Sequence, residues 1–141
     1  MRRIALLCVT GIGLAGVLRQ GAESSTESAE RDERAHGRYL VHEVAMCVQC
    51  HSPRDERGAL VPERLLTGAA VPVAAPAPLE PFWAQRAPHL RGLPGYREEQ
   101  AVRLLTEGIA ADGRAPRPPM PPFRMSESDA RAVYRYLSSL E

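Results

Sequence analysis

Two cysteines and a histidine stand close together in the first half of this 141-residue chain, in the sequence Cys47-Val48-Gln49-Cys50-His51. Two thiols separated by two residues can add to the two vinyl groups along one edge of a haem, and the imidazole that follows can then bind the iron. This C-x-x-C-H spacing is typical of covalent c-type haem attachment. We therefore expect one haem c, bound covalently through Cys47 and Cys50, with His51 as an axial ligand of the iron.

Two other kinds of site use a C-x-x-C pair. A redox dithiol is typical of a βαβ unit, and no part of this sequence alternates apolar and polar residues over a length that predicts a strand. A zinc site needs two more ligands, whereas the remaining histidines, His36, His42 and His89, have no paired spacing. Haem is therefore the favoured interpretation, and we expect His36 and His42 to be exposed on a helix.

The second axial ligand can be sought among the four methionines of the chain. Met1 lies in the N-terminal segment, and Met46 adjoins the cysteine motif too closely to reach the opposite face of a haem easily. Met120 stands in a Pro-Pro-Met-Pro-Pro sequence, and prolines stiffen the chain by fixing φ. Met125 directly precedes a predicted helix. We expect Met120 to bind the iron and Met125 to pack in the core.

The distribution of proline predicts the elements that position these residues. All 13 prolines lie between Pro53 and Pro122. Because proline interrupts helices, this favours a helix over residues 34–46, another that begins at an N-cap Ser126, and a loop-rich middle. A further helix is predicted over residues 96–107, with Gly108 at its end. The expected fold class is all-α, with three or more helices and long proline-rich loops wrapped around one haem.

The N-terminus carries a targeting signal. Two arginines precede an uncharged apolar run over residues 4–18, the layout of a signal peptide. This run is shorter than the roughly 20 residues that span a bilayer comfortably, but a retained membrane anchor or a lipid on Cys8 are alternatives. We expect a signal peptide or anchor over residues 1–20, a flexible tether over residues 21–33, and a domain over residues 34–141 that is periplasmic or otherwise extracytoplasmic.

The charge balance excludes one class of partner. The formal net charge is +1, and all 18 basic residues are arginine. No excess of positive charge is present to neutralise phosphates, so a strongly basic nucleic-acid binder is excluded. Three cysteines are too few for a disulfide-dense scaffold.

The combination of the motif at residues 47–51 with a proline-flanked Met120, between predicted helices, resembles class I cytochromes c of the small bacterial single-haem kind. The resemblance covers residues 34–141. It implies a cytochrome c-like fold in which the first and last helices cross in close contact. The matching positions are Gly37 and Val41 on the first helix, and Val133, Tyr136 and Leu137 on the last.

The resemblance also implies that a proline carbonyl accepts a hydrogen bond from the proximal histidine, and Pro88 matches that position. The Phe82-Trp83 pair is expected to pack on the haem or its propionates, so Trp83 is a further candidate. One departure concerns docking, because the best-known members bind partners through lysines around the haem edge, and this chain has no lysine.

These expectations predict an electron carrier rather than an enzyme. With His51 and Met120 as axial ligands, the haem would have a raised reduction potential, suited to one-electron transfer between redox partner proteins late in a respiratory chain. An alternative is the haem-bearing subunit of a larger exported dehydrogenase or respiratory complex, which an extended apolar face on the loop over residues 61–81, rich in proline and alanine, would indicate. A third is an enzyme or gas sensor with an open iron.

Overall fold

A computed structural model describes residues 15–141, with side chains from residue 25 onward. Most of the expected signal peptide or anchor therefore lies outside the described residues. The chain divides into an N-terminal unit that ends at Arg31 and a larger unit, Asp32–Glu141. Within the described part, no helix combines the length and the apolar character needed to cross a membrane.

Residues 21–33 form part of a helix, α1, Ala15–Tyr39. The expectation of a flexible tether is therefore corrected, because the segment is helical. Its low hydrophobicity is consistent with the exposure of residues 25–32. It does not decide the backbone conformation: glutamate is the commonest residue of the segment, which has no proline, and glutamate favours helix even without burial.

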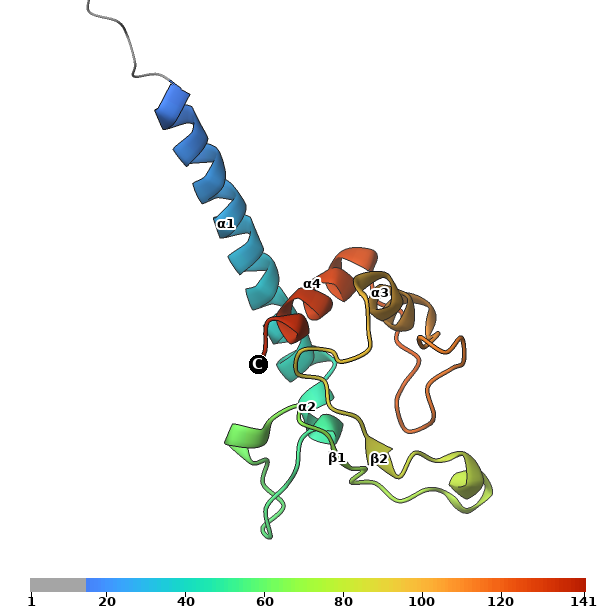
Figure 1. Ribbon diagram of the computed structural model, residues 1–141. Coiled ribbons are helices and arrows are strands. Elements are labelled where there is room, and N and C mark those ends of the chain that lie inside the picture. The colour runs from blue at the N-terminus through green and yellow to red at the C-terminus, as the bar shows by residue number, and fades with distance from the viewer. Residues whose placement is uncertain (1–14) are drawn as a thin grey trace, which may run out of the picture. The chain divides into compact units, whose positions relative to one another are not determined.

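The larger unit is mainly helical, so the all-α class is confirmed at that level (Figure 1). A π-helical turn, Leu40–Val44, follows α1 and leads to the short α2, Cys47–His51. The longer helices α3, Glu98–Glu107, and α4, Glu127–Ser138, pack against each other. Between α2 and α3 the chain forms 3-10 turns, Pro62–Arg64 and Ala77–Phe82, and a two-stranded antiparallel ladder, β1 Ala69–Ala70 with β2 Arg86–Ala87.

The helix ends follow the sequence signals. The Oγ of Ser126 accepts a hydrogen bond from the backbone N–H of Asp129 at 3.1 Å, so the expected N-cap of α4 is confirmed. Helix α3 begins at Glu98, two residues later than expected, and ends at Gly108. Gly108 has φ 73°, a left-handed conformation that glycine adopts without a steric penalty.

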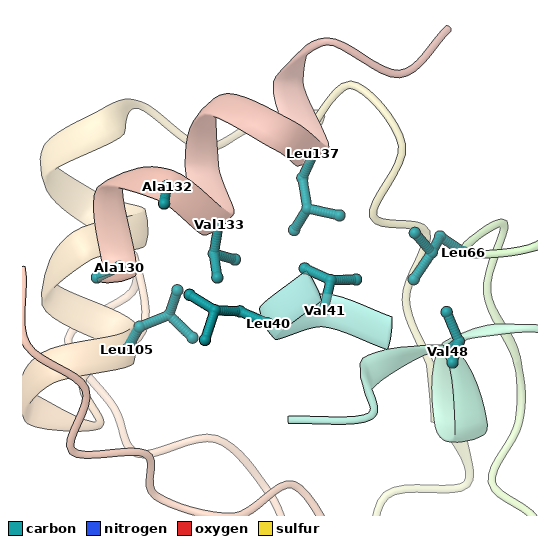
Figure 2. Close-up of a cluster of buried hydrophobic side chains, with 9 residues drawn as sticks. All are labelled: Leu40, Val41, Val48, Leu66, Leu105, Ala130, Ala132, Val133 and Leu137. Atoms are coloured by element: carbon teal, nitrogen blue, oxygen red, sulfur yellow. The ribbon is translucent and has the colours of Figure 1, made fainter. Parts of the chain in front are cut away.

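The core lies where the π-helical turn, α2, α3 and α4 meet (Figure 2). The buried face of α4 consists of Ala130, Ala132, Val133 and Leu137. Val41 is fully buried beside them, as the resemblance implies. The whole cluster comprises Leu40, Val41, Val48, Leu66, Leu105, Ala130, Ala132, Val133 and Leu137.

The end of α1 crosses α4 at Gly37. A Cβ atom added there would lie 1.9 Å from the carbonyl oxygen of Ala132 and 2.9 Å from Cβ of Tyr136. No side chain fits that space, so only glycine allows the two backbones to approach this closely. The expected close contact is present. The residue nearest to Gly37 is Ala132, which is not among the positions that the resemblance implies.

Candidate functional site

Helix α2 brings the two thiols and the imidazole together on a little more than one turn. Met46 precedes it with φ 49°, a left-handed conformation that ends the preceding helical segment and turns the chain into α2. Cys47 and Cys50 are free thiols and half-buried, while His51 is buried. Cys47 and His51 are four residues apart, so they lie on the same face of α2.

The ring of His51 is fixed by a hydrogen bond. Its Nδ1 lies 2.8 Å from the carbonyl oxygen of Pro88, so the hydrogen bond implied by the resemblance is present. A carbonyl oxygen only accepts, so Nδ1–H donates and the other ring nitrogen, Nε2, carries the lone pair of the neutral imidazole. Nε2 is then the nitrogen available to bind a metal.

The short ladder of β1 and β2 delivers Pro88 to His51. Ala69 pairs with Ala87, which directly precedes Pro88. On the β1 side, the backbone N–H of Gly68 donates to the carbonyl of His51 at 2.8 Å. The ring and the main chain of His51 are therefore tied to neighbouring strands of the same ladder.

Two residues that sequence reasoning missed complete this support. Gly68 has φ 82°, and a Cβ there would lie 3.0 Å from both the carbonyl oxygen of Ala87 and the N–H nitrogen of His89. The Oγ of buried Ser52 accepts a hydrogen bond from the N–H of buried Leu66 at 2.9 Å. The sequence carries no periodic signal for either, because each is set by a tertiary contact.

Burial controls the protonation of the site. It lowers the pKa of His51, and the hydrogen bond to Pro88 opposes this shift only in part. Burial also raises the pKa of the Cys47 thiol to about 11. The imidazole is thus held in its neutral, metal-binding form, whereas a redox dithiol needs a thiol whose pKa is lowered.

The two candidate methionines occupy different surroundings. Met125 packs against the core cluster, and its N–H donates to the carbonyl of Leu105 at 3.0 Å, which confirms the expected packing role. Met120 is half-buried and lies outside the described core cluster, in a turn closed by its N–H and the carbonyl of Arg117 at 3.2 Å. Among the described residues, no hydrogen bond joins this turn to α2, so iron binding by Met120 stays a prediction.

Trp83 belongs to the proline-alanine loop, residues 71–85, which connects β1 to β2. Its indole N–H donates to the carbonyl of Val73 at 3.2 Å and so holds the loop together. Contact of Trp83 with haem stays a prediction. Three of the exposed large apolar side chains lie on this loop, with exposed fractions of 50% for Val73, 42% for Leu79 and 64% for Phe82.

The N-terminal histidines differ from each other. His36 is exposed, as expected, and its Nε2 lies 2.7 Å from the carboxylate of Asp129. The expectation that His42 is exposed is wrong, because its Nε2 lies 2.8 Å from the hydroxyl of Tyr136 and the ring is half-buried. The crossing of α1 and α4 covers His42, a tertiary effect that helical spacing alone did not show.

The donor set fits a covalently bound haem better than a bare metal ion. Over the described part of the chain, no three His, Cys, Asp or Glu side chains gather into a metal-binding group. Two free thiols and a fixed imidazole with a free Nε2 match the requirements of thioether attachment and axial ligation. Val44 and Met46, shortly before the motif, expose 55% and 52% of their surface.

Comparison of the chain with protein-family models gives no match, and comparison with curated proteins gives none either. The assignment of a function therefore depends on the residues and their geometry.

Proposed function

We propose that this chain is an extracytoplasmic class I cytochrome c with a cytochrome c-like fold, which carries single electrons between redox partner proteins. The observation that carries the proposal is the hydrogen bond from His51 to Pro88, made directly beside two free thiols at C-x-x-C spacing. A histidine held at Nδ1 presents Nε2 in a fixed direction, which a metal ligand requires.

The helix crossing supports the proposal independently. The resemblance implies a glycine on the first helix against the last, and Gly37 lies against Ala132 and Tyr136. The cysteine motif and the crossing are separate features of the sequence, and the structure contains the expected local geometry for each.

The residues have distinct roles in this proposal. Cys47 and Cys50 would hold haem c, His51 would be the proximal ligand and Met120 the distal ligand. The iron, when bound, supplies the one-electron chemistry by changing between its ferrous and ferric states. Burial keeps the His51 imidazole neutral, so a proton does not compete with the metal for Nε2.

The exposed apolar side chains of the proline-alanine loop favour a second candidate. Val73, Leu79 and Phe82 are exposed apolar side chains of the kind that a permanent subunit of a larger exported dehydrogenase or respiratory complex would bury. The haem chemistry is the same in both cases. Co-purification of the native protein with a stoichiometric partner would favour the subunit, and a monomeric native protein would favour the free carrier.

Mass spectrometry tests the proposal. The protein is produced in a bacterial host that attaches haem c to exported proteins, and the intact mass should exceed that of the mature polypeptide by one haem. Cys47→Ser with Cys50→Ser should lose this mass, whereas Cys8→Ser, which changes the third cysteine, should keep it. Folded wild-type protein with the mass of the polypeptide alone contradicts the proposal.

A further inference from the structure

The turn that carries Met120 is fastened to the proline-alanine loop by one side chain. The guanidinium of Arg117 donates from Nε to the carbonyl of Phe82 at 3.1 Å and from Nη2 to the carbonyl of Pro81 at 3.0 Å. Arg117 and Met120 also close the same turn, because the N–H of Met120 donates to the carbonyl of Arg117.

A backbone hydrogen bond lies beside this contact. The N–H of Ala84 donates to the carbonyl of Pro118 at 2.6 Å. Three hydrogen bonds therefore join residues 117–118 to residues 81–84, two segments that lie far apart in the chain.

The chemistry of arginine suits this contact. A guanidinium is a planar group with several fixed donors, so it can hold two successive carbonyl oxygens at once, which a lysine ammonium does less well. Proline has no N–H, so a turn rich in proline contributes few backbone donors of its own. Arg117 supplies donors that the surrounding prolines lack.

We propose that Arg117 is a positioning residue for Met120: its two hydrogen bonds to Pro81 and Phe82 hold the turn so that the thioether stays at the iron. This inference rests on the proposed function. It makes the sixth ligand dependent on the proline-alanine loop, which Trp83 holds together through Val73. Loss of the Arg117 contact frees the turn, and an external ligand then competes more effectively with Met120.

Three variants of the haem-loaded protein test this role. Arg117→Ala removes both hydrogen bonds, and Arg117→Lys keeps the charge without the planar group. Arg114→Ala is the matched control, because Arg114 lies in the same connection between α3 and α4, is exposed, and has a guanidinium that makes no hydrogen bond within the described part of the chain. Each variant is titrated with carbon monoxide in the ferrous state, and the sulfur-to-iron charge-transfer band is recorded in the ferric state.

Carbon monoxide should bind Arg117→Ala about tenfold more tightly than the wild type, since the lost hydrogen bonds are exposed and their combined effect is modest. The charge-transfer band should weaken in the same variant. Arg117→Lys should show a smaller change in the same direction, and Arg114→Ala should match the wild type. Equal carbon monoxide affinity in Arg117→Ala and Arg114→Ala overturns the inference. If Arg117→Ala does not fold, equal carbon monoxide affinity in Arg117→Lys and the wild type overturns it instead.

Hydrogen exchange separates failure of this inference from failure of the proposed function. The amide of Ala84 should exchange about tenfold faster in Arg117→Ala than in Arg114→Ala. A wild-type protein without haem overturns the proposed function and the role of Arg117 toward Met120 together. If the wild type carries haem, but Arg117→Ala shows unchanged carbon monoxide binding and unchanged exchange at Ala84, only the role of Arg117 is overturned.

Discussion

On the His51 side of the candidate site, a buried ring and its own main chain are both tied to the β1–β2 ladder, through Pro88 and Gly68. On the Met120 side, an exposed arginine and one backbone hydrogen bond tie a proline-rich turn to the proline-alanine loop. Buried hydrogen bonds are costly to break because water does not replace the lost partner. The proposed proximal ligand, His51, is therefore buried and held from two sides, whereas the proposed distal ligand, Met120, depends on contacts at the surface.

This asymmetry has a functional consequence in the proposed cytochrome. Ligand exchange and changes of reduction potential should originate on the Met120 side, because local opening there exposes few buried contacts. Events at the surface of residues 71–85 would be transmitted to the iron through the distal ligand, and the proximal bond would change little.

The largest effect is expected from Gly68→Ala, compared with Gly58→Ala. Both glycines have φ 82°, so both variants carry the cost of a left-handed alanine, about 1 kcal/mol. A Cβ at Gly58 would meet no atom within 4 Å, whereas one at Gly68 would press on the backbone beside Pro88. We expect Gly68→Ala to lower the free energy of unfolding by about 2–4 kcal/mol.

Urea unfolding of the two variants measures this difference. Equal destabilisation would show that the backbone beside Pro88 yields easily, and the claim of a rigid proximal side would then fail.

A smaller effect is expected from Ser52→Ala, compared with Ser126→Ala. The Ser52 hydroxyl accepts from the N–H of buried Leu66, so its removal leaves that donor unsatisfied at a cost of about 1–3 kcal/mol. The Ser126 hydroxyl caps the exposed start of α4, where water can replace it, at about 1 kcal/mol. Thermal and urea unfolding compare the two, and a larger loss for Ser126→Ala would contradict the assigned importance of the buried hydrogen bond.

The smallest effect concerns acid and the ring of His42. Burial, helped by the charge of Arg38, lowers the pKa of His42. The unfolded chain protonates this ring near pH 6.5 and the folded chain only at lower pH, so the unfolded state binds more protons between these values. The neutral His42 ring therefore makes its full contribution to the free energy of unfolding above about pH 6.5. This contribution is lost as the pH falls from the pKa of the unfolded chain through the lower pKa of the folded chain.

Two variants separate burial from hydrogen bonding at this ring. His42→Gln should reduce the loss of stability between about pH 7 and about pH 5. Tyr136→Phe removes the hydroxyl partner but keeps the ring that covers His42, so most of the acid sensitivity should remain. If Tyr136→Phe abolishes the acid sensitivity as fully as His42→Gln does, burial of the ring is not the main cause of that sensitivity.

The sequence was informative where the signal is local. The proline distribution, the Ser126 cap and Gly108 predicted the main helices of the domain. The motif predicted that two thiols and an imidazole meet on one turn, and the resemblance pointed to Pro88 as the partner of His51.

The remaining features depend on contacts between distant segments. Gly68 and Arg117 face backbone atoms that lie roughly 20 or more residues away in the chain, and neither belongs to a periodic pattern. His42 became half-buried because α4 crosses above it. The helical state of residues 21–33 does not follow from their low hydrophobicity, because low hydrophobicity determines burial and not backbone conformation.

The most direct test of the account is the visible spectrum of Met120→Ala beside Met125→Ala in the haem-loaded protein. The wild type should show six-coordinate low-spin iron with a sulfur-to-iron charge-transfer band near the red edge of the visible range. Met120→Ala should lose the band, become high-spin or water-ligated, bind carbon monoxide readily and have a lower reduction potential. Met125→Ala should keep the band and lose about 1–3 kcal/mol of stability, since Met125 packs only partly buried against the core. Loss of the band in Met125→Ala alone, or its persistence in both variants, would contradict the assignment of Met120 as the surface-controlled distal ligand.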